Sequence, residues 1–144
     1  MPVRVATGTV RGVPERRASC SCGQLRAVVT GDPVRVSLCH CLACQRRTGS
    51  SYGYQARFPA QSIAISGRSK QFIRHSDEDA EIRRFNFCPE CGATVFHTSG
   101  DSEDLIAIPV GAFADPAFAH PQVSVWEERK HGWVVIPDET EHTY

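Results

Sequence analysis

Three features are scarce in this sequence, and each absence excludes a class of protein. No apolar run approaches the roughly 20 residues that a membrane-spanning helix needs. The 16 Lys and Arg residues are balanced by 16 Asp and Glu residues, so no net positive charge attracts nucleic acid. Residues 1–17 lack the continuous apolar stretch of a secretory signal. We therefore expect a cytoplasmic protein whose partners include neither membranes nor nucleic acid.

The length and composition predict one folded domain. A chain of 144 residues buries about two-thirds of its unfolded surface and needs no disulfides for stability. Its 41% hydrophobic and 22% charged residues lie near the average of globular proteins. We expect a flexible lead-in rich in Arg, Gly and Pro at residues 1–17, a folded domain at 18–137 and a polar tail at 138–144.

Many short segments of β-branched or aromatic residues, separated by Gly, Pro or Asp, predict a mainly β fold. The predicted strands are residues 25–29, 34–38, 52–58, 62–66, 70–75, 82–87, 94–97, 105–110 and 122–126, with an edge strand around 3–10. Residues 42–49 end in glycine and are expected to form a single helical turn. Because no helical pattern of 10 to 15 residues separates the strands, an antiparallel sandwich or open barrel is favoured.

The sequence is rich in cysteine, and its seven cysteines lie in three tight groups. The groups are Cys20 with Cys22, then Cys39, Cys41 and Cys44, then Cys88 with Cys91. An odd number cannot pair completely into disulfides, and short spacings in a chain without an export signal are more typical of metal ligands. Thiolates are soft ligands that select zinc or iron–sulfur centres. The cysteines therefore predict metal binding.

Two partitions of the seven sulfurs are compatible with their spacing. In the first, four cysteines close a structural zinc site, and the other three surround a second zinc that keeps one open position. The four are Cys20, Cys22, Cys88 and Cys91, and the three are Cys39, Cys41 and Cys44. In the second partition, two zinc knuckles, each with two residues between its cysteines, bind one zinc. The knuckles are Cys41 with Cys44 and Cys88 with Cys91. Cys20, Cys22 and Cys39 are then left over. Spacing alone does not choose between the two.

The order of the motifs resembles a known family. The chain carries CxCG from Cys20, CHCxxCxRxxG from Cys39, FCxxCG from Phe87 and VGAFADP from Val110. This order is similar to that of the glutathione-dependent formaldehyde-activating enzyme (GFA) family, which includes centromere protein V, over about residues 18–133. The resemblance implies the first partition, two zinc ions per chain and a β-tent of packed antiparallel sheets joined by zinc. Residues 18–137 would then be a GFA-like zinc-binding domain.

The resemblance also implies a carbon–sulfur lyase that adds glutathione to formaldehyde, as an S-hydroxymethylglutathione synthase does. Three thiolates on Zn²⁺ leave one net negative charge, so the metal is a weak Lewis acid and a soft thiol is its natural fourth ligand. Coordination would hold that thiol as the thiolate near neutral pH. We therefore expect Cys39, Cys41 and Cys44 to bind a catalytic zinc, with a glutathione-like thiol and an aldehyde as partners of a monomer or homodimer.

Polar residues near the second zinc suggest both a substrate contact and an alternative function. Arg46 and Arg47 follow the three cysteines directly, and guanidinium forks match carboxylates, so we expect this pair to bind a carboxylate of the thiol. His40 lies between two of the ligands and is expected to point to the opposite face of the chain. In the alternative, His97, His75 or a carboxylate closes the second zinc, and the protein is a non-catalytic zinc-binding module.

Overall fold

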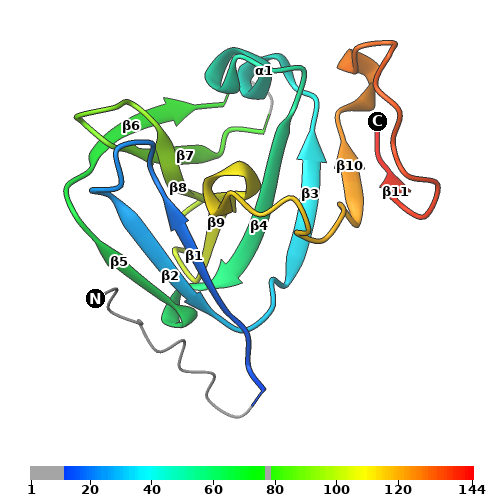
Figure 1. Ribbon diagram of the computed structural model, residues 1–144. Helices are drawn as coiled ribbons and strands as arrows, with labels where there is room; N and C mark the ends of the chain where they lie inside the picture. Colours follow the sequence, from blue (N-terminus) through cyan, green and yellow to red (C-terminus); the bar gives the residue numbers. More distant parts are fainter. Residues whose placement is uncertain (1–11, 77–78) are drawn as a thin grey trace.

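The protein folds into short strands that form two sheets (Figure 1). The computed structural model describes residues 12–76 and 79–144. Within these ranges the strands are β1 (Glu15–Ser19), β2 (Arg26–Thr30), β3 (Arg35–Cys39), β4 (Gly53–Pro59), β5 (Ile63–Ser66), β6 (Lys70–His75), β7 (Ile82–Phe87), β8 (Thr94–Ser99), β9 (Leu105–Pro109), β10 (Val123–Val125) and β11 (Glu141–His142). The helical elements are α1 (Leu42–Thr48), η1 (Ala60–Ser62), η2 (Val110–Phe113) and η3 (Glu127–Arg129). The prediction of a mainly β chain is confirmed.

The smaller sheet has the order β1-β2-β5, and the larger sheet has the order β11-β10-β3-β4-β9-β8-β7-β6. Strand β1 begins at Glu15, ahead of the domain start predicted at Ala18, because its whole length pairs with β2. The rest of the predicted lead-in, including the edge strand expected around residues 3–10, falls mainly on residues 1–11, which lie outside the described ranges. No helix in the described ranges is both long and apolar enough to cross a membrane.

One edge of the larger sheet departs from the antiparallel pattern. Strand β10 pairs in parallel with β3, and β11 pairs in parallel with β10. Parallel neighbours need a long connection, and the chain builds most of the domain between β3 and β10. Strand β11 lies within the segment 138–144, whose composition predicts a polar tail. Its pairing uses backbone N–H and C=O groups, which the polarity of the side chains does not reveal.

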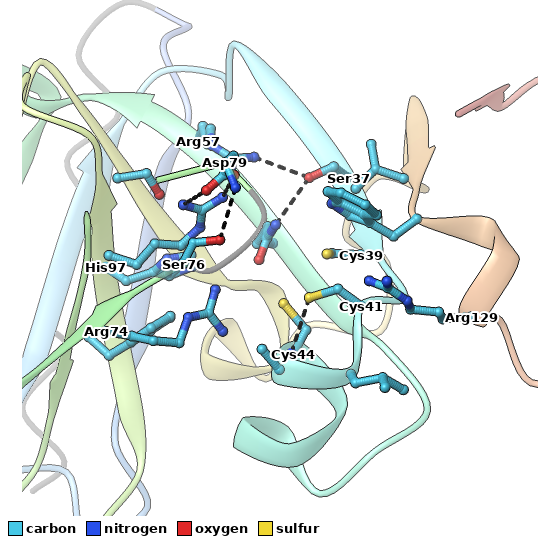
Figure 2. A pocket seen from close by; sticks show the side chains of 18 of the residues that line it. Ser37, Cys39, Cys41, Cys44, Arg57, Arg74, Ser76, Asp79, His97 and Arg129 are labelled. Atoms are coloured by element: carbon cyan, nitrogen blue, oxygen red, sulfur yellow. Dashed lines mark hydrogen bonds and ion pairs between the residues drawn. The ribbon is translucent and has the colours of Figure 1, made fainter. Parts of the chain in front are cut away.

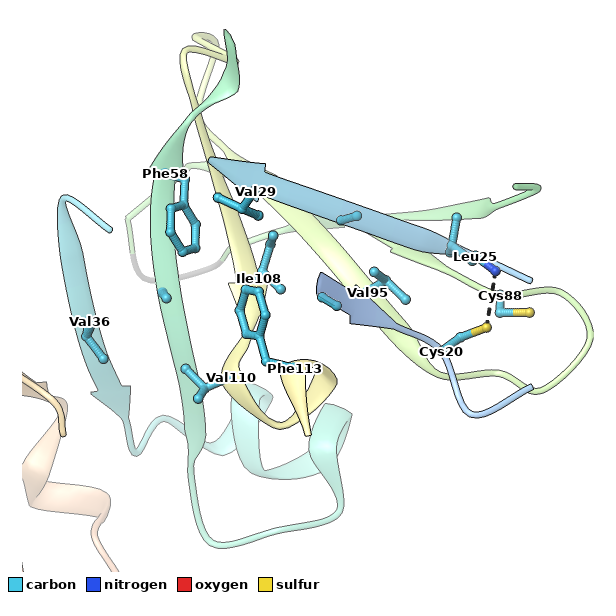
Figure 3. Close-up of a cluster of buried hydrophobic side chains, with 13 residues drawn as sticks. Cys20, Leu25, Val29, Val36, Phe58, Cys88, Val95, Ile108, Val110 and Phe113 are labelled. Atoms are coloured by element: carbon cyan, nitrogen blue, oxygen red, sulfur yellow. Dashed lines mark hydrogen bonds between the residues drawn. The ribbon is translucent and has the colours of Figure 1, made fainter. Parts of the chain in front are cut away.

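The hydrophobic core lies between the two sheets (Figure 3). Its fully buried side chains include Leu25 and Val29 from the smaller sheet and its turn, and Phe58, Val95 and Ile108 from the larger sheet. Burial of each large apolar side chain stabilises the fold by about 1.5–3 kcal/mol. Two further buried residues, Cys20 and Cys88, lie at one end of this core (Figure 3). The core therefore positions the two hairpins that carry these cysteines.

The two faces of the larger sheet differ in polarity. Successive side chains of a strand point to opposite faces. In β4, Ala56 and Phe58 face the core, whereas Gln55 and Arg57 face a cavity on the other side. The same alternation places Val36 of β3 in the core and Ser37 in the cavity. The sheet thus separates an apolar core from a polar cavity.

Candidate metal sites and an adjoining cavity

The structure brings four cysteines together where two hairpins meet. The connection between β1 and β2 supplies Cys20 and Cys22, and the connection between β7 and β8 supplies Cys88 and Cys91. The Sγ atom of Cys22 lies 3.6 Å from that of Cys20 and 3.7 Å from that of Cys88. A tetrahedral zinc with bonds of about 2.3 Å separates its sulfurs by about 3.8 Å. The four sulfurs, all free thiols, therefore fit one tetrahedral zinc.

Hydrogen-bond donors surround the sulfurs of this four-cysteine site. The Leu25 N–H donates to Cys20 Sγ at 3.3 Å, and the Glu90 N–H donates to Cys88 Sγ at 3.4 Å. The side-chain amide of Gln24 donates to Cys88 Sγ at 2.8 Å. Burial by itself would raise the pKa of Cys88, but hydrogen bonds from the Gln24 side chain and from the backbone N–H groups of Cys91 and Glu90 lower it to about 6. The surroundings of Cys88 therefore favour the thiolate that a metal requires.

Gln24 also fixes the loop beside the four-cysteine site. Its amide nitrogen donates to the carbonyl of Arg68 at 2.8 Å, and its amide oxygen accepts the Arg68 N–H at 2.9 Å. Gly67 approaches this point so closely that a Cβ there would lie 2.0 Å from the Gln24 carbonyl oxygen, with the glycine at φ +94°. A side chain at position 67 would therefore displace the residue that supports Cys88.

The other three cysteines are brought together by one turn of chain. Cys39 ends β3, and Cys41 caps helix α1, its Sγ accepting the Cys44 N–H at 3.3 Å. Cys44 lies in the first turn of the helix, so its sulfur is on the same side of the helix as the sulfur of the N-cap residue Cys41. The helix ends at Gly49, whose left-handed conformation lets its N–H bond to the Gln45 carbonyl. Helix α1 has seven residues and is longer than the single turn predicted.

The ligand atoms of Cys39, Cys41 and Cys44 all lie within 4.8 Å of one another, and the three side chains are buried. Hydrogen bonds from the other two thiols lower the pKa of Cys41. Gly53 lies opposite Cys39 in β4, and a Cβ there would lie 3.5 Å from Cys44 Sγ, at ordinary van der Waals distance, so β4 packs directly against the cluster. The three sulfurs fit three positions of a zinc site.

No fourth ligand joins the three cysteines among residues 12–76 and 79–144. Neither His97 nor His75, the histidines considered from sequence, belongs to the group. The buried His40 points away, as its position predicts, and its Nε2 forms a 2.9 Å hydrogen bond with the Ser124 hydroxyl. The geometry therefore leaves the fourth position of a tetrahedral ion to a group from outside these residues.

A cavity of about 300 Å³ opens beside the three cysteines (Figure 2). Its floor is the polar face of the larger sheet, where residues of β3 and β4 face each other in pairs. These pairs are Cys39 with Gly53, Ser37 with Gln55, and Arg35 with Arg57. Further walls come from α1, from β6 and β7, and from the segment after β10 that contains Trp126. The three cysteines and several arginines thus line the same cavity.

The cavity is strongly basic. Its described lining holds five arginines and one carboxylate, that of Asp79. The arginines are Arg35, Arg57, Arg74, Arg83 and Arg129. The carboxylate pairs with Arg83 at 2.6 Å, and this hydrogen bond lowers the pKa of Asp79 to about 2. Burial, then the neighbouring Arg35 and Arg83, lowers the pKa of Arg57. The cavity therefore offers positive charge to an anion.

His97 of β8 is the other unusual side chain of the cavity. It is 3% exposed, and neither ring nitrogen has a hydrogen-bond partner among the described residues. Burial, then the charges of arginines beginning with Arg47 and Arg57, lowers the pKa of His97 to about 3. The ring is therefore neutral at physiological pH, with one donor and one acceptor nitrogen.

The two arginines expected from sequence to meet the substrate lie on α1 at a neighbouring, mostly apolar cavity. Arg46 is exposed. The guanidinium of Arg47 lies over the ring of Phe85, 4.9 Å from its centroid, and its buried Nε has no hydrogen-bond partner among the described residues. Phe85 lines both cavities, so Arg47 adjoins the space beside the cysteines without lining it.

Sequence reasoning missed the residues that line the cavity floor. One signal was present, since Arg35 and Ser37 alternate with buried apolar residues in the strand that ends at Cys39. Period-two alternation places them on the same face as that ligand. The position of Arg57 carried no such signal, because its pairing opposite Arg35 depends on the register of β4, across the intervening helix.

Comparison with known proteins agrees with this geometry. The family model of the glutathione-dependent formaldehyde-activating enzyme matches residues 15–129. The chain belongs to this family. The matched segment runs from the first residue of β1 to the last of η3, so it contains all seven cysteines and the cavity floor.

One solved structure extends the comparison to the fold. A structural-genomics target, a protein from Rhodobacter sphaeroides, superposes with a TM-score of 0.52 at 17% sequence identity. The match covers 69% of this chain and 91% of that one. At this identity the similarity concerns the fold alone. Among curated proteins, none matches the chain.

Proposed function

We propose that this GFA-family protein is a zinc-dependent carbon–sulfur lyase that adds a glutathione-type thiol to formaldehyde or a similar aldehyde, or catalyses the reverse cleavage. The observation that carries the proposal is the three-cysteine cluster, which no described residue completes and which adjoins a cavity. The family match supports zinc, glutathione and formaldehyde as the chemistry. A reducing cytoplasm would keep the seven free thiols available for metal.

Two zinc ions would have different roles in this proposal. One, held by Cys20, Cys22, Cys88 and Cys91, would be structural, because four thiolates complete its coordination. The other would be held by Cys39, Cys41 and Cys44 and would supply an open position for a thiol, which it would stabilise as the thiolate.

The reaction needs no oxidant or reductant. The S–H bond of the thiol breaks as the thiolate forms, and its proton passes to water. A C–S bond then forms between the sulfur and the aldehyde carbon, the carbonyl π electrons move to oxygen, and that oxygen takes up a proton from water. The three cysteines fix the sulfur at one end of the cavity, and the sheet limits the directions from which the aldehyde can approach. Arg46 and Arg47, which line the neighbouring apolar cavity, remain candidates for binding a carboxylate of the thiol.

Following adduct formation by NMR in a mixture of zinc-loaded protein, glutathione and formaldehyde tests the proposal. We expect the adduct to form faster than in a protein-free control and the Cys44→Ser variant to lose the acceleration. A rate equal to the protein-free control would refute the formaldehyde reaction. Finding a second zinc with four protein ligands by X-ray absorption would instead favour the alternative, a non-catalytic zinc-binding module.

A further inference from the structure

Two arginines on the cavity floor face each other, and no carboxylate in the part of the chain that the structure describes pairs with either of them. Arg35 of β3 and Arg57 of β4 are directly opposite in an antiparallel pair, where like charges destabilise a sheet. Neither forms an ion pair with a carboxylate among the described residues, although four other arginines of the protein do so at 3.1 Å or less. Such an arrangement is explained when an anion binds between the two side chains.

The guanidinium of Arg57 is held near the sheet. Its Nη1 donates to the Ser37 hydroxyl at 3.2 Å, and Gln55 Nε2 donates to the same oxygen at 3.4 Å (Figure 2). Ser37 is 1% exposed, so this support is rigid. Ser37, the residue that accepts the guanidinium hydrogen bond, precedes the ligand Cys39 by two positions in an extended strand and so lies about 7 Å along the strand from it.

A second observation also indicates a ligand at this place. His97, buried and neutral, has no hydrogen-bond partner for either ring nitrogen among the described residues. His97 and Arg57 lie on the two strands that flank β9, and both residues pair with Ala107 of that strand. The two side chains are therefore at the same level of the sheet. A buried polar group without a partner is costly, and a bound oxygen atom removes that cost.

The charges decide what kind of ligand fits. The only carboxylate in the described lining, Asp79, is already paired with Arg83. Arginine forks recognise carboxylates by two parallel hydrogen bonds, and a partly buried site strengthens them. A neutral or cationic thiol would leave Arg35 and Arg57 facing each other, whereas a carboxylate would relieve their repulsion.

We propose that Arg57 and Arg35 form a carboxylate subsite that selects thiols whose carboxylate is separated from the sulfur by several bonds. This inference rests on the proposed function, because the three-cysteine zinc is taken to hold the sulfur. Arg57 is then a specificity-determining residue at the inner end of the cavity, distinct from Arg46 and Arg47 on the helix.

Calorimetric titration of the zinc-loaded protein tests the subsite without requiring turnover. The probes are 4-mercaptobutyrate, the uncharged 4-mercaptobutanol of equal chain length, and the shorter mercaptoacetate. We expect 4-mercaptobutyrate to bind about 10- to 100-fold more tightly than the alcohol, as the loss of a charge-assisted hydrogen bond implies. Mercaptoacetate should bind less tightly than 4-mercaptobutyrate, since it cannot reach both groups. Equal binding of the acid and the alcohol would overturn the proposal.

Variants separate a binding role from a structural one. Arg57→Gln should abolish the preference for the acid, and Arg57→Lys should keep part of it, since a lysine retains charge without the fork. The matched control is Arg84→Gln, an arginine of β7 whose Nη1 bonds to the Gly100 carbonyl. The control should leave the preference intact. The same loss in both variants would contradict the assignment.

Thermal unfolding without ligand supplies a further readout. Because Arg57→Gln removes one of two facing charges, its melting temperature should not fall below that of the wild type. It should, however, lose the stabilisation that 4-mercaptobutyrate gives the wild type. A lower melting temperature without ligand would mean that Arg57 stabilises the fold instead. If the protein prefers 4-mercaptobutyrate to the alcohol but does not accelerate adduct formation, only the proposed reaction is refuted. If it accelerates adduct formation but shows no such preference, only the carboxylate subsite is refuted.

Discussion

The two cysteine sites contrast in how the chain builds them. The four-cysteine site joins two hairpins that are far apart in sequence, and Cys22 and Cys91 are exposed at its surface. The three-cysteine site comes from one continuous segment, is buried, and adjoins a cavity. A metal in the first site would hold the fold together, whereas a metal in the second would hold a ligand. The difference shows that the same ligand atom serves stability or chemistry according to what surrounds it.

The largest expected effect comes from breaking the four-cysteine site. In the Cys88→Ser variant, one buried ligand is lost and the two hairpins are no longer joined by metal, so most of the typical 5–15 kcal/mol of stability should disappear. Cys44→Ser should lose one zinc per chain but retain a cooperative unfolding transition. Zinc content by mass spectrometry and thermal unfolding by circular dichroism distinguish the two. Equal destabilisation by both variants would contradict the contrast.

Metal removal should also separate the sites. A site with three protein ligands is expected to release zinc to a weaker chelator than a site with four. We expect a first zinc to leave with the fold intact and a second to leave only as the chain unfolds. A colorimetric zinc assay, recorded together with far-ultraviolet circular dichroism, measures both steps. Release of both ions in one step, with unfolding, would be inconsistent with this order.

Substitution of two glutamines should have a smaller effect, limited to the zinc affinity of one site. Gln24 donates to Cys88 Sγ, so Gln24→Leu should weaken zinc at the four-cysteine site by about 10- to 100-fold. Gln45 instead joins α1 to the C-terminal segment, its amide nitrogen donating to the carbonyls of His40 and Arg129. Gln45→Leu should leave the four-cysteine site unchanged. Competition with a zinc-binding dye gives both affinities, and a weakened four-cysteine site in the second variant would argue against separate supports.

The last comparison concerns pH. The pKa of His97 is lowered to about 3 in the fold, whereas an unfolded histidine titrates near 6.5. Between these values the unfolded chain binds a proton that the folded chain does not, so the wild type loses stability as the pH falls through this window. His97→Gln removes this loss, and its stability relative to the wild type should rise from pH 7 to pH 4. Denaturant unfolding measures this, with zinc content checked at each pH. A constant difference would exclude the effect.

Much of the fold could be predicted from sequence because the signals are local. Strands β6 and β7 have the bounds that their β-branched and aromatic residues predict, and the grouping of the cysteines follows from their spacing and the family resemblance. The parallel edge could not be predicted, because the short strand Val123–Val125 finds its partner far away in the sequence. The pairing of Arg35 with Arg57 was hidden for the same reason. Local patterns thus predicted elements and ligands, but not the chemistry of the cavity between them.

The late position of β10 has a consequence for the newly synthesised chain. The three cysteines lie within residues 39–44, but the wall that includes Val125 and Trp126 is synthesised more than 80 residues later. Until that wall docks beside β3, the three thiols lack their covering and remain open to oxidants and stray metal ions. Early capture of zinc would therefore protect the nascent polypeptide, and cells short of zinc should accumulate oxidised, incompletely folded chains.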